Sequence, residues 1–247
     1  MIISVINHTH GQLTDEQLQV AIRAVNRQIA HDFEPYWSLG AELRLEGRSQ
    51  KRLNRHSLAD MRGDAVLYVW DKIDVPGVTG YHERNDRGIP FGIVFTDLAQ
   101  ELGDPWSVTL SHEAIELIGD PEANLLVVGP DPRDNRRRVF HWYELCDAVQ
   151  DESYEVDGVM VSNFVLPLYF TSSEERGGRN DFLGRTYKGK TLESFGVNPG
   201  GYIGFYDPRS RQIGSFTAKG DHRAETRRAI KNRARGSRSA LRLARAM

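Results

Sequence analysis

Three side chains on one short segment could together bind a metal ion and activate a water molecule. His112 and Glu116 are four residues apart, so on a helix they would project from one face, one turn from each other. This spacing allows a divalent metal ion to be held by two side chains of a single helix. Glu113 follows His112 directly, where its carboxylate could take a proton from water at the metal. We therefore expect His112 and Glu116 to be metal ligands and Glu113 to be a general base.

A third ligand must come from another part of the chain. Glu144 lies 28 residues beyond Glu116, and a helix there would place Glu144 and Asp147 on one face. We expect Glu144 to bind the metal. Asp147 would orient His112 by accepting the proton on the other ring nitrogen, a common role for a carboxylate behind a metal-bound histidine.

Alternatives to this ligand set remain open. Glu122 could be brought in by a turn at the end of the helix, but Pro121 makes such a turn unusual. Asp120 is another candidate, which we expect to support the helix end instead. It is also possible to explain the same residues without a metal, as a network of buried polar groups that satisfy one another on a largely apolar helix.

The elements that must position these residues alternate between strands and helices, which predicts an α+β domain with helices packed against a twisted sheet. Short β-branched or apolar runs predict the strands, and apolar residues at three-to-four spacing predict the helices. Polar and glycine-rich stretches predict the turns. The expected elements are strands at Ile2–Ile6, Leu43–Leu45, Ala65–Trp70, Pro76–Tyr81 and Ile89–Phe95, helices from Thr14 to about His31 and over Trp106–Ile118, a turn at Asn85–Gly88, a polar loop over Asp131–Arg138, and a turn at Asp157–Gly158.

Composition places the chain among ordinary globular proteins. Its 247 residues are 39% hydrophobic and 27% charged, which excludes collagen, coiled coils and wholesale disorder. The one cysteine, Cys146, excludes an internal disulfide framework and is typical of a reducing compartment. The N-terminus does not resemble a signal peptide, and no apolar stretch is long enough to span a membrane. We therefore expect a cytoplasmic protein that does not act at a membrane.

Charge is distributed unevenly along the chain. Residues 209–247 contain twelve basic and two acidic residues, whereas residues 1–208 contain 20 basic and 32 acidic ones. We expect one domain over residues 1–207, a mobile loop within it at 171–180, and a basic tail over 208–247 that is helical or flexible. Such a tail could contact an acidic protein surface or bind nucleic acid without sequence preference, because no aromatic residue follows Phe216 to stack on bases.

The stretch from Val66 to Phe170 resembles a little-characterised family of bacterial and phage proteins with a zincin-like fold of the gluzincin type. The residues that carry this resemblance are Trp106–Glu113, Asp120–Pro121, Glu144–Val149 and Tyr154–Pro167. The resemblance implies a bound zinc or other divalent ion, with His112, Glu116 and Glu144 as ligands and Glu113 as the base. The zinc-peptidase helix carries a second histidine where this chain has Glu116.

The resemblance also implies a function, a metal-dependent hydrolase that acts on a peptide or protein. In zincins an edge strand beside the metal helix pairs with an extended substrate, and Gly77–Tyr81 or Phe91–Phe95 would be its equivalent. Tyr154 could donate a hydrogen bond to the oxyanion that forms during hydrolysis. The alternative is a catalytically inactive zincin-like module, which would act through contacts of its basic tail with a partner or nucleic acid.

Overall fold

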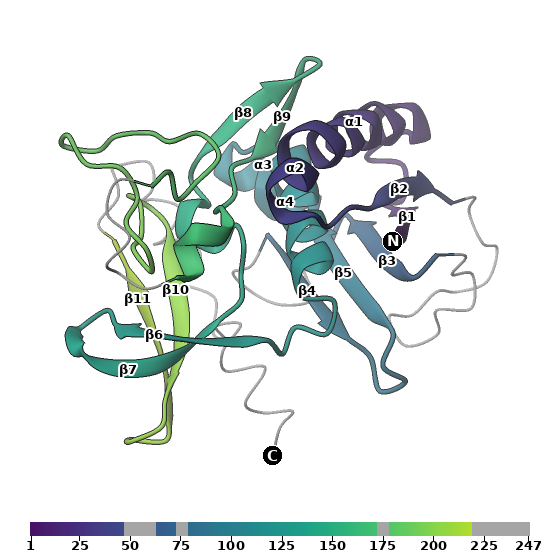
Figure 1. Cartoon of the computed structure of the whole chain (residues 1–247). Coiled ribbons are helices and arrows are strands. Elements are labelled where there is room, and N and C mark those ends of the chain that lie inside the picture. The colour runs from purple at the N-terminus through teal and green to yellow at the C-terminus, as the bar shows by residue number, and fades with distance from the viewer. Residues whose placement is uncertain (47–62, 73–78, 172–177, 219–247) are drawn as a thin grey trace. The chain divides into compact units, whose positions relative to one another are not determined.

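The computed structural model describes residues 1–46, 63–72, 79–171 and 178–218 (Figure 1). It forms an α+β fold, as predicted, and the chain divides into two compact units. The first unit contains Met1–Ala123 and Tyr154–Val161, and the second contains Asn124–Ser153 and the chain from Ser162 onward. Most of the expected basic tail and residues 172–177 of the expected mobile loop lie outside the described residues.

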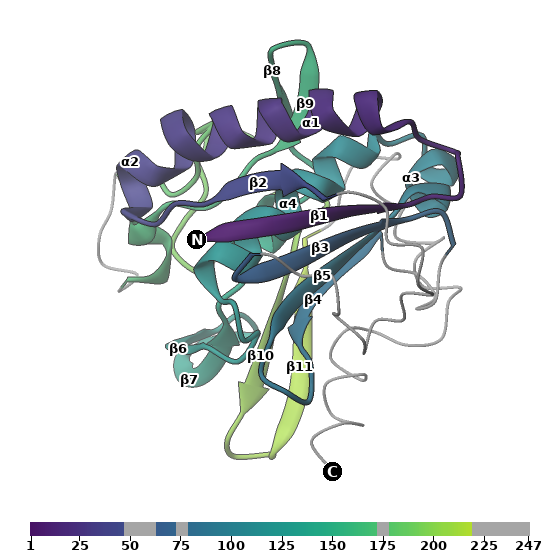
Figure 2. The ribbon, with the colours of Figure 1, turned by 90° about the vertical axis from the view of Figure 1, so that its right-hand side faces the viewer.

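The first unit is built on a five-stranded sheet, whose strands lie next to one another in Figure 2. The strand order is β2-β1-β3-β5-β4, in which β4 is antiparallel to β5 and the other neighbours are parallel. The inner strands are buried on both faces, which explains their continuous apolar sequences. The strands are β1 (Ile2–His8), β2 (Glu42–Leu45), β3 (Ala65–Trp70), β4 (Gly80–Arg84) and β5 (Pro90–Phe95).

These strands settle which of the two expected segments lies at the edge of the sheet. β5 lies between β3 and β4, so the expectation that Phe91–Phe95 could be an edge strand is wrong. β4 is the last strand of the described sheet, and it includes Gly80 and Tyr81 of the other candidate, Gly77–Tyr81, of which residues 77–78 lie outside the described residues. The expected hairpin between the two strands is present, with the turn held by the Asn85 side chain.

Helices of the first unit pack against this sheet. The long helix α1 (Asp15–Gln28) begins at a capping box, in which Thr14 and Gln17 satisfy each other's backbone N–H groups. α1 packs against β2, and α4 (Trp106–Gly119) packs against β3, β4 and β5. The remaining helices are a π-helix at Ile29–Phe33, α2 (Glu34–Trp37) and α3 (Thr96–Leu102). Among the described residues, none of these helices has the length and apolar character needed to cross a membrane.

The second unit contains a four-stranded antiparallel sheet of order β11-β10-β7-β6. Its strands are β6 (Leu126–Asp131), β7 (Asp134–Trp142), β10 (Tyr202–Asp207) and β11 (Gln212–Thr217). The expectation of a polar loop over Asp131–Arg138 is mostly wrong, because Asp131 ends β6 and Asp134–Arg138 belongs to β7. Within β7, Arg137 is compensated by Asp207 at 2.7 Å and by Asp131 at 3.7 Å. β11 also continues the ordered chain past Asp207, the residue at which we expected the domain to end.

A long irregular segment of the second unit is held by buried polar side chains. Asn163 donates from its amide nitrogen to Glu152 at 2.7 Å and to Asp181 at 2.9 Å. Asn198 and Tyr187 donate to the other oxygen of Glu152. Burial raises the pKa of the Glu152 carboxyl. Asn180, at the end of the expected mobile loop, is itself buried and donates to the carbonyl of Leu192, so this part of the segment is well anchored.

The chain crosses between the two units at a β-hairpin. β8 (Ser153–Val156) and β9 (Val159–Ser162) are joined at Asp157 and Gly158, which both have positive φ, as this kind of tight turn requires. The expected turn is therefore confirmed. Within the first unit, Arg27 of α1 pairs with Asp157 at 2.8 Å.

Candidate metal centre

Helix α4 carries the residues that the sequence singles out, and it is almost wholly buried. It runs from Trp106 to Gly119, as expected, and Asp120 ends it by donating its backbone N–H to the carbonyl of Glu116 at 2.8 Å. Asp120 thus has the helix-end position that we predicted for it. Because α4 is covered on most sides, any charged group on it is removed from water and needs a compensating partner.

His112 and Glu116 contact each other on this helix. The Nε2 atom of His112 lies 3.2 Å from Oε1 of Glu116, and only 12% of the His112 side chain is exposed, against none of Glu116. Glu113 is also buried. One ligand atom from each of His112, Glu113 and Glu116 falls within 4.8 Å of the others. The helix therefore brings together the three residues predicted from spacing.

A fourth residue, His82 on strand β4, lies beside the two carboxylates of this cluster within the first unit. Its Nδ1 atom lies 3.5 Å from Oε2 of Glu116 and 3.7 Å from Oε2 of Glu113, and its side chain is fully buried. The Glu116 carboxylate consequently has one oxygen beside His112 and the other beside His82. Because the sequence spacing offered no metal partner for His82, we did not predict its participation.

The close approach of β4 to α4 depends on a glycine. A Cβ atom at Gly80 would lie 2.8 Å from Oε1 of Glu113 and 2.8 Å from Cγ2 of Thr109. These distances are shorter than ordinary van der Waals contacts, so a side chain at position 80 would compete with Glu113 for space. Gly80 and His82 are two residues apart on one strand and face the same side of it. His82 directly follows the expected strand Pro76–Tyr81, and extending that strand by one residue would have placed Gly80 and His82 on one face of it.

The donor atoms in the cluster suit a zinc-class ion. Two imidazoles and two carboxylates offer nitrogen and oxygen ligands, a combination that catalytic zinc sites use. Imidazole also favours transition metals over magnesium and calcium, which prefer oxygen ligands alone. If both imidazoles are neutral, the four side chains carry two negative charges in a buried place, which a divalent cation would neutralise. The residues therefore fit the metal that the resemblance implies.

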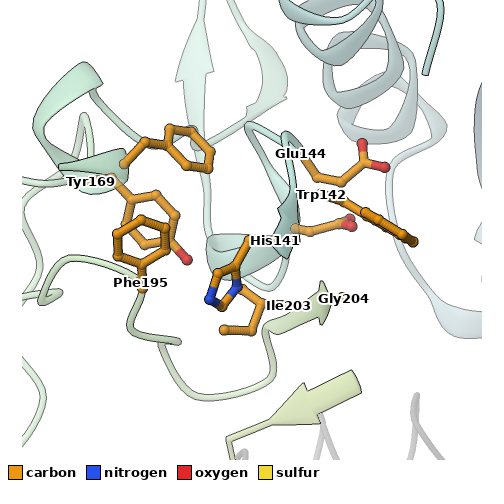
Figure 3. A pocket seen from close by; sticks show the side chains of 9 residues that line it. His141, Trp142, Glu144, Tyr169, Phe195, Ile203 and Gly204 are labelled. Atoms are coloured by element: carbon orange, nitrogen blue, oxygen red, sulfur yellow. The ribbon is translucent and has the colours of Figure 1, made fainter. Parts of the chain in front are cut away.

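Two predicted site residues belong to the second unit. Glu144 and Asp147 line a small pocket of that unit together with His141, Trp142, Tyr169 and Phe195. In Figure 3, Glu144 and Trp142 lie on one side of this pocket and Tyr169 and Phe195 on the other. Burial, followed by the charge of Asp147, raises the pKa of the Tyr169 phenol, and burial lowers the pKa of His141.

The backbone around Glu144 differs from our expectation. Glu144 precedes a short 3-10 helix at Asp147–Val149, so the two carboxylates do not share a face of one α-helix. The roles predicted for them at the metal stay predictions, since they belong to a different unit from His112.

The remaining candidates have partners elsewhere in the first unit. Glu122 is half exposed and pairs with Arg84 at 3.2 Å, which argues against it as a third metal ligand. The Tyr154 hydroxyl donates to Asp32 at 2.8 Å and accepts from the Gln28 amide at 3.1 Å. These bonds hold Tyr154 against α1 and the π-helix after it, which gives its hydroxyl a structural role there.

Comparison of the sequence with models of known families gives no match, and a search of curated proteins gives none either.

Proposed function

We propose that the chain is a zinc-dependent hydrolase of the zincin-like type that acts on peptide bonds. The observation that carries the proposal is the buried Glu116 carboxylate, which lies between His112 and His82 and beside Glu113. In this proposal His112, Glu116 and His82 hold the metal. Glu144 is the competing third ligand, on the strength of the sequence resemblance. Two imidazoles and one carboxylate are a donor set found in zinc hydrolases.

When bound, a zinc ion supplies Lewis acidity, which polarises a carbonyl group and makes water easier to deprotonate. The chain's own residues do the rest. Glu113 takes the proton of the attacking water and later delivers it to the leaving amine. Its carboxylate is well placed for this role because Gly80 leaves room for it between strand and helix. Burial of the cluster excludes bulk water, which strengthens the electrostatic interactions among these groups.

An antiparallel edge strand beside the metal helix supports a peptide as the substrate class. β4 is the last strand of the described sheet, and an extended peptide can pair with the backbone of such a strand. The same strand carries His82, so a peptide on β4 would be aligned beside the cluster. This arrangement is what the zincin resemblance leads one to expect of a peptidase.

The decisive test compares variants that keep the shape of the cluster and change one function. Glu113→Gln should keep stoichiometric zinc and reduce hydrolysis of a mixed peptide library by about 10²–10⁴-fold, the usual contribution of a positioned base. Glu116→Ala should lose the zinc. Glu101→Gln is the matched control, because Glu101 is exposed on α3 and should change neither property. Zinc is measured by elemental analysis of the purified protein and after dialysis against zinc.

Further variants identify the third ligand. His82→Ala should lower zinc content if His82 is the ligand, and Glu144→Ala should lower it if Glu144 is. A protein that takes up no zinc even after dialysis would refute the hydrolase. The cluster would then be a network in which imidazoles and carboxylates satisfy each other, and the inactive module would be the better description.

A further inference from the structure

A second pair of histidines lies at the carboxyl ends of the parallel strands in the first unit. His8 is the last residue of β1, and its register partner Trp70 is the last residue of β3. The chain goes from β1 to β2 on one side and then crosses to β3 on the other side of β1. In open sheets of parallel strands, ligands bind beyond the carboxyl ends of the strands at such a reversal of direction. The loop after β1 is therefore where this sheet is expected to bind a ligand.

Buried hydrogen bonds fix this loop. Thr9, between the two histidines, is 1% exposed, and its hydroxyl donates to Oδ1 of Asn7 at 2.9 Å. The same hydroxyl accepts from the backbone N–H of Leu13 at 3.0 Å, and the Asn7 amide donates to the Leu13 carbonyl at 3.0 Å. Thr9 thus faces inward and is locked in place. The histidines on either side of it, His8 and His10, are more exposed.

The conformation of His10 is unusual for a residue with a Cβ atom. Its φ is +50°, in the left-handed region, and the next residue, Gly11, has a φ of +98°. Left-handed backbone at a non-glycine residue costs energy, and such residues occur mainly where the surrounding structure enforces them, often at functional sites. Here the enforced turn brings the rings of His8 and His10 to 4.8 Å from each other, centroid to centroid.

Asp71 determines which nitrogen of His10 can bind a ligand. The Nδ1 atom of His10 lies 2.9 and 3.1 Å from the two oxygens of Asp71, which follows β3. A carboxylate accepts hydrogen bonds, so Nδ1 carries a proton and donates. In the neutral ring the lone pair is then on Nε2. A carboxylate behind an imidazole in this way is the usual support of a metal-binding histidine.

We propose that His8 and His10 bind a divalent transition-metal ion of the zinc class, with Asp71 holding His10 in the ligand tautomer. The spacing of the rings is compatible with a shared ion. With metal–nitrogen bonds of about 2.0–2.1 Å and a tetrahedral angle, two imidazole centroids would lie about 5 Å apart. The observed 4.8 Å is close to this value. The His10 side chain is 60% exposed, so solvent or a ligand can reach the remaining coordination positions.

This site is independent of the α4 cluster, and zinc titration by calorimetry can separate the two. In the full-length protein carrying Glu116→Ala, the α4 cluster is disabled, and we expect one zinc ion to bind with an affinity that depends on the histidine pair. His8→Ala and His10→Ala should each weaken this binding at least tenfold. Asp71→Asn should weaken it by about 10–100-fold, as is typical for loss of a supporting carboxylate. His31→Ala, at an exposed histidine of the same unit, is the matched control and should change nothing.

If the Glu116→Ala protein does not fold, the same histidine and Asp71 substitutions are made in the otherwise unaltered chain. There, His10→Ala should remove one zinc-binding event and leave any zinc binding at the α4 cluster. Failure of the proposed hydrolase would remove only the α4 event. The proposal is overturned if the His8→Ala and His10→Ala proteins bind zinc with the same affinity and stoichiometry as the His31→Ala control.

Discussion

Replacement of Gly80 by alanine tests the contact between β4 and α4 on which the candidate centre depends. The new methyl group would lie 2.8 Å from Oε1 and 2.9 Å from Cγ of Glu113, and 2.8 Å from Cγ2 of Thr109. Ordinary carbon contacts are about 3.5–4.0 Å, so three atoms on the helix would have to move. Inserting a methyl group into such a packed place costs about 1–3 kcal/mol. For a chain of this size each kcal/mol lowers the melting temperature by about 2–4 °C.

The substitution should also separate zinc binding from catalysis. Because Glu113 is proposed as the base and not as a ligand, Gly80→Ala should retain zinc. A displacement of about 1 Å at the base can lower the rate by about 10²-fold. Gly63→Ala is the matched control, since its methyl group would lie 2.5 Å from the carbonyl oxygen of Ile2 in β1 and should destabilise the same sheet away from Glu113 and His82. The reasoning is refuted if Gly80→Ala melts and hydrolyses peptides as the unaltered protein does, measured by calorimetry and by single-turnover rates.

Three other predictions follow from individual contacts. Tyr154→Phe removes the hydroxyl between Asp32 and Gln28. It should lower the free energy of unfolding, measured by denaturant titration, by about 1–3 kcal/mol and leave peptide hydrolysis unchanged. A lower rate of hydrolysis at full stability would support an oxyanion role for Tyr154 instead. The Arg133 hydrogen bond lowers the pKa of Asp131 from 3.8 to about 2, so its contribution to stability is present above pH 3.8 and is lost as the pH falls towards 2. Arg133→Ala should therefore destabilise the protein at neutral pH, and unfolding midpoints of the two proteins should converge below pH 2. Gly200→Ala should destabilise the second unit by about 2–4 kcal/mol, because φ is +83° there and the methyl group would collide with Asp151; an unchanged thermal unfolding curve would contradict this.

Local sequence signals predicted most elements of the first unit. The apolar run Ala65–Trp70 is β3, and the polar tetrad Asn85–Gly88 is the turn between β4 and β5. The apolar positions of α4 predicted its burial, and four-residue spacing predicted the contact of His112 with Glu116. Each of these features leaves a pattern within a short window of sequence, which is the range over which patterns of apolar residues are informative.

Features that depend on distant parts of the chain were missed. His82 joins the cluster because α4 packs across β4 and β5, a contact between distant parts of the chain that no local pattern encodes. The first half of β7, Asp134–Arg138, is another such feature, because its charged residues match the pattern of a polar loop. Arg137 is tolerated in the strand because Asp131 and Asp207, the latter far along the chain, supply opposite charges. The grouping of the β8–β9 hairpin with the first unit is likewise a long-range feature, because a long stretch of sequence separates this hairpin from the residues it joins.

The glutamate at position 116 has a physical explanation once His82 is considered. A zinc-peptidase helix supplies two imidazoles, and its third ligand is often a carboxylate from elsewhere in the fold. Here α4 supplies one imidazole and one carboxylate, and the strand that packs on it places a second imidazole beside that carboxylate, with Nδ1 of His82 3.5 Å from Glu116. In the proposed site the total is therefore unchanged at two nitrogens and one oxygen, so a metal held by these three residues would have the net charge and Lewis acidity of an ordinary zinc hydrolase. If Glu144 were the third ligand instead of His82, the ligand set would be more anionic and the metal a weaker Lewis acid. The comparison of His82→Ala with Glu144→Ala consequently bears on reactivity as well as on the identity of the third ligand.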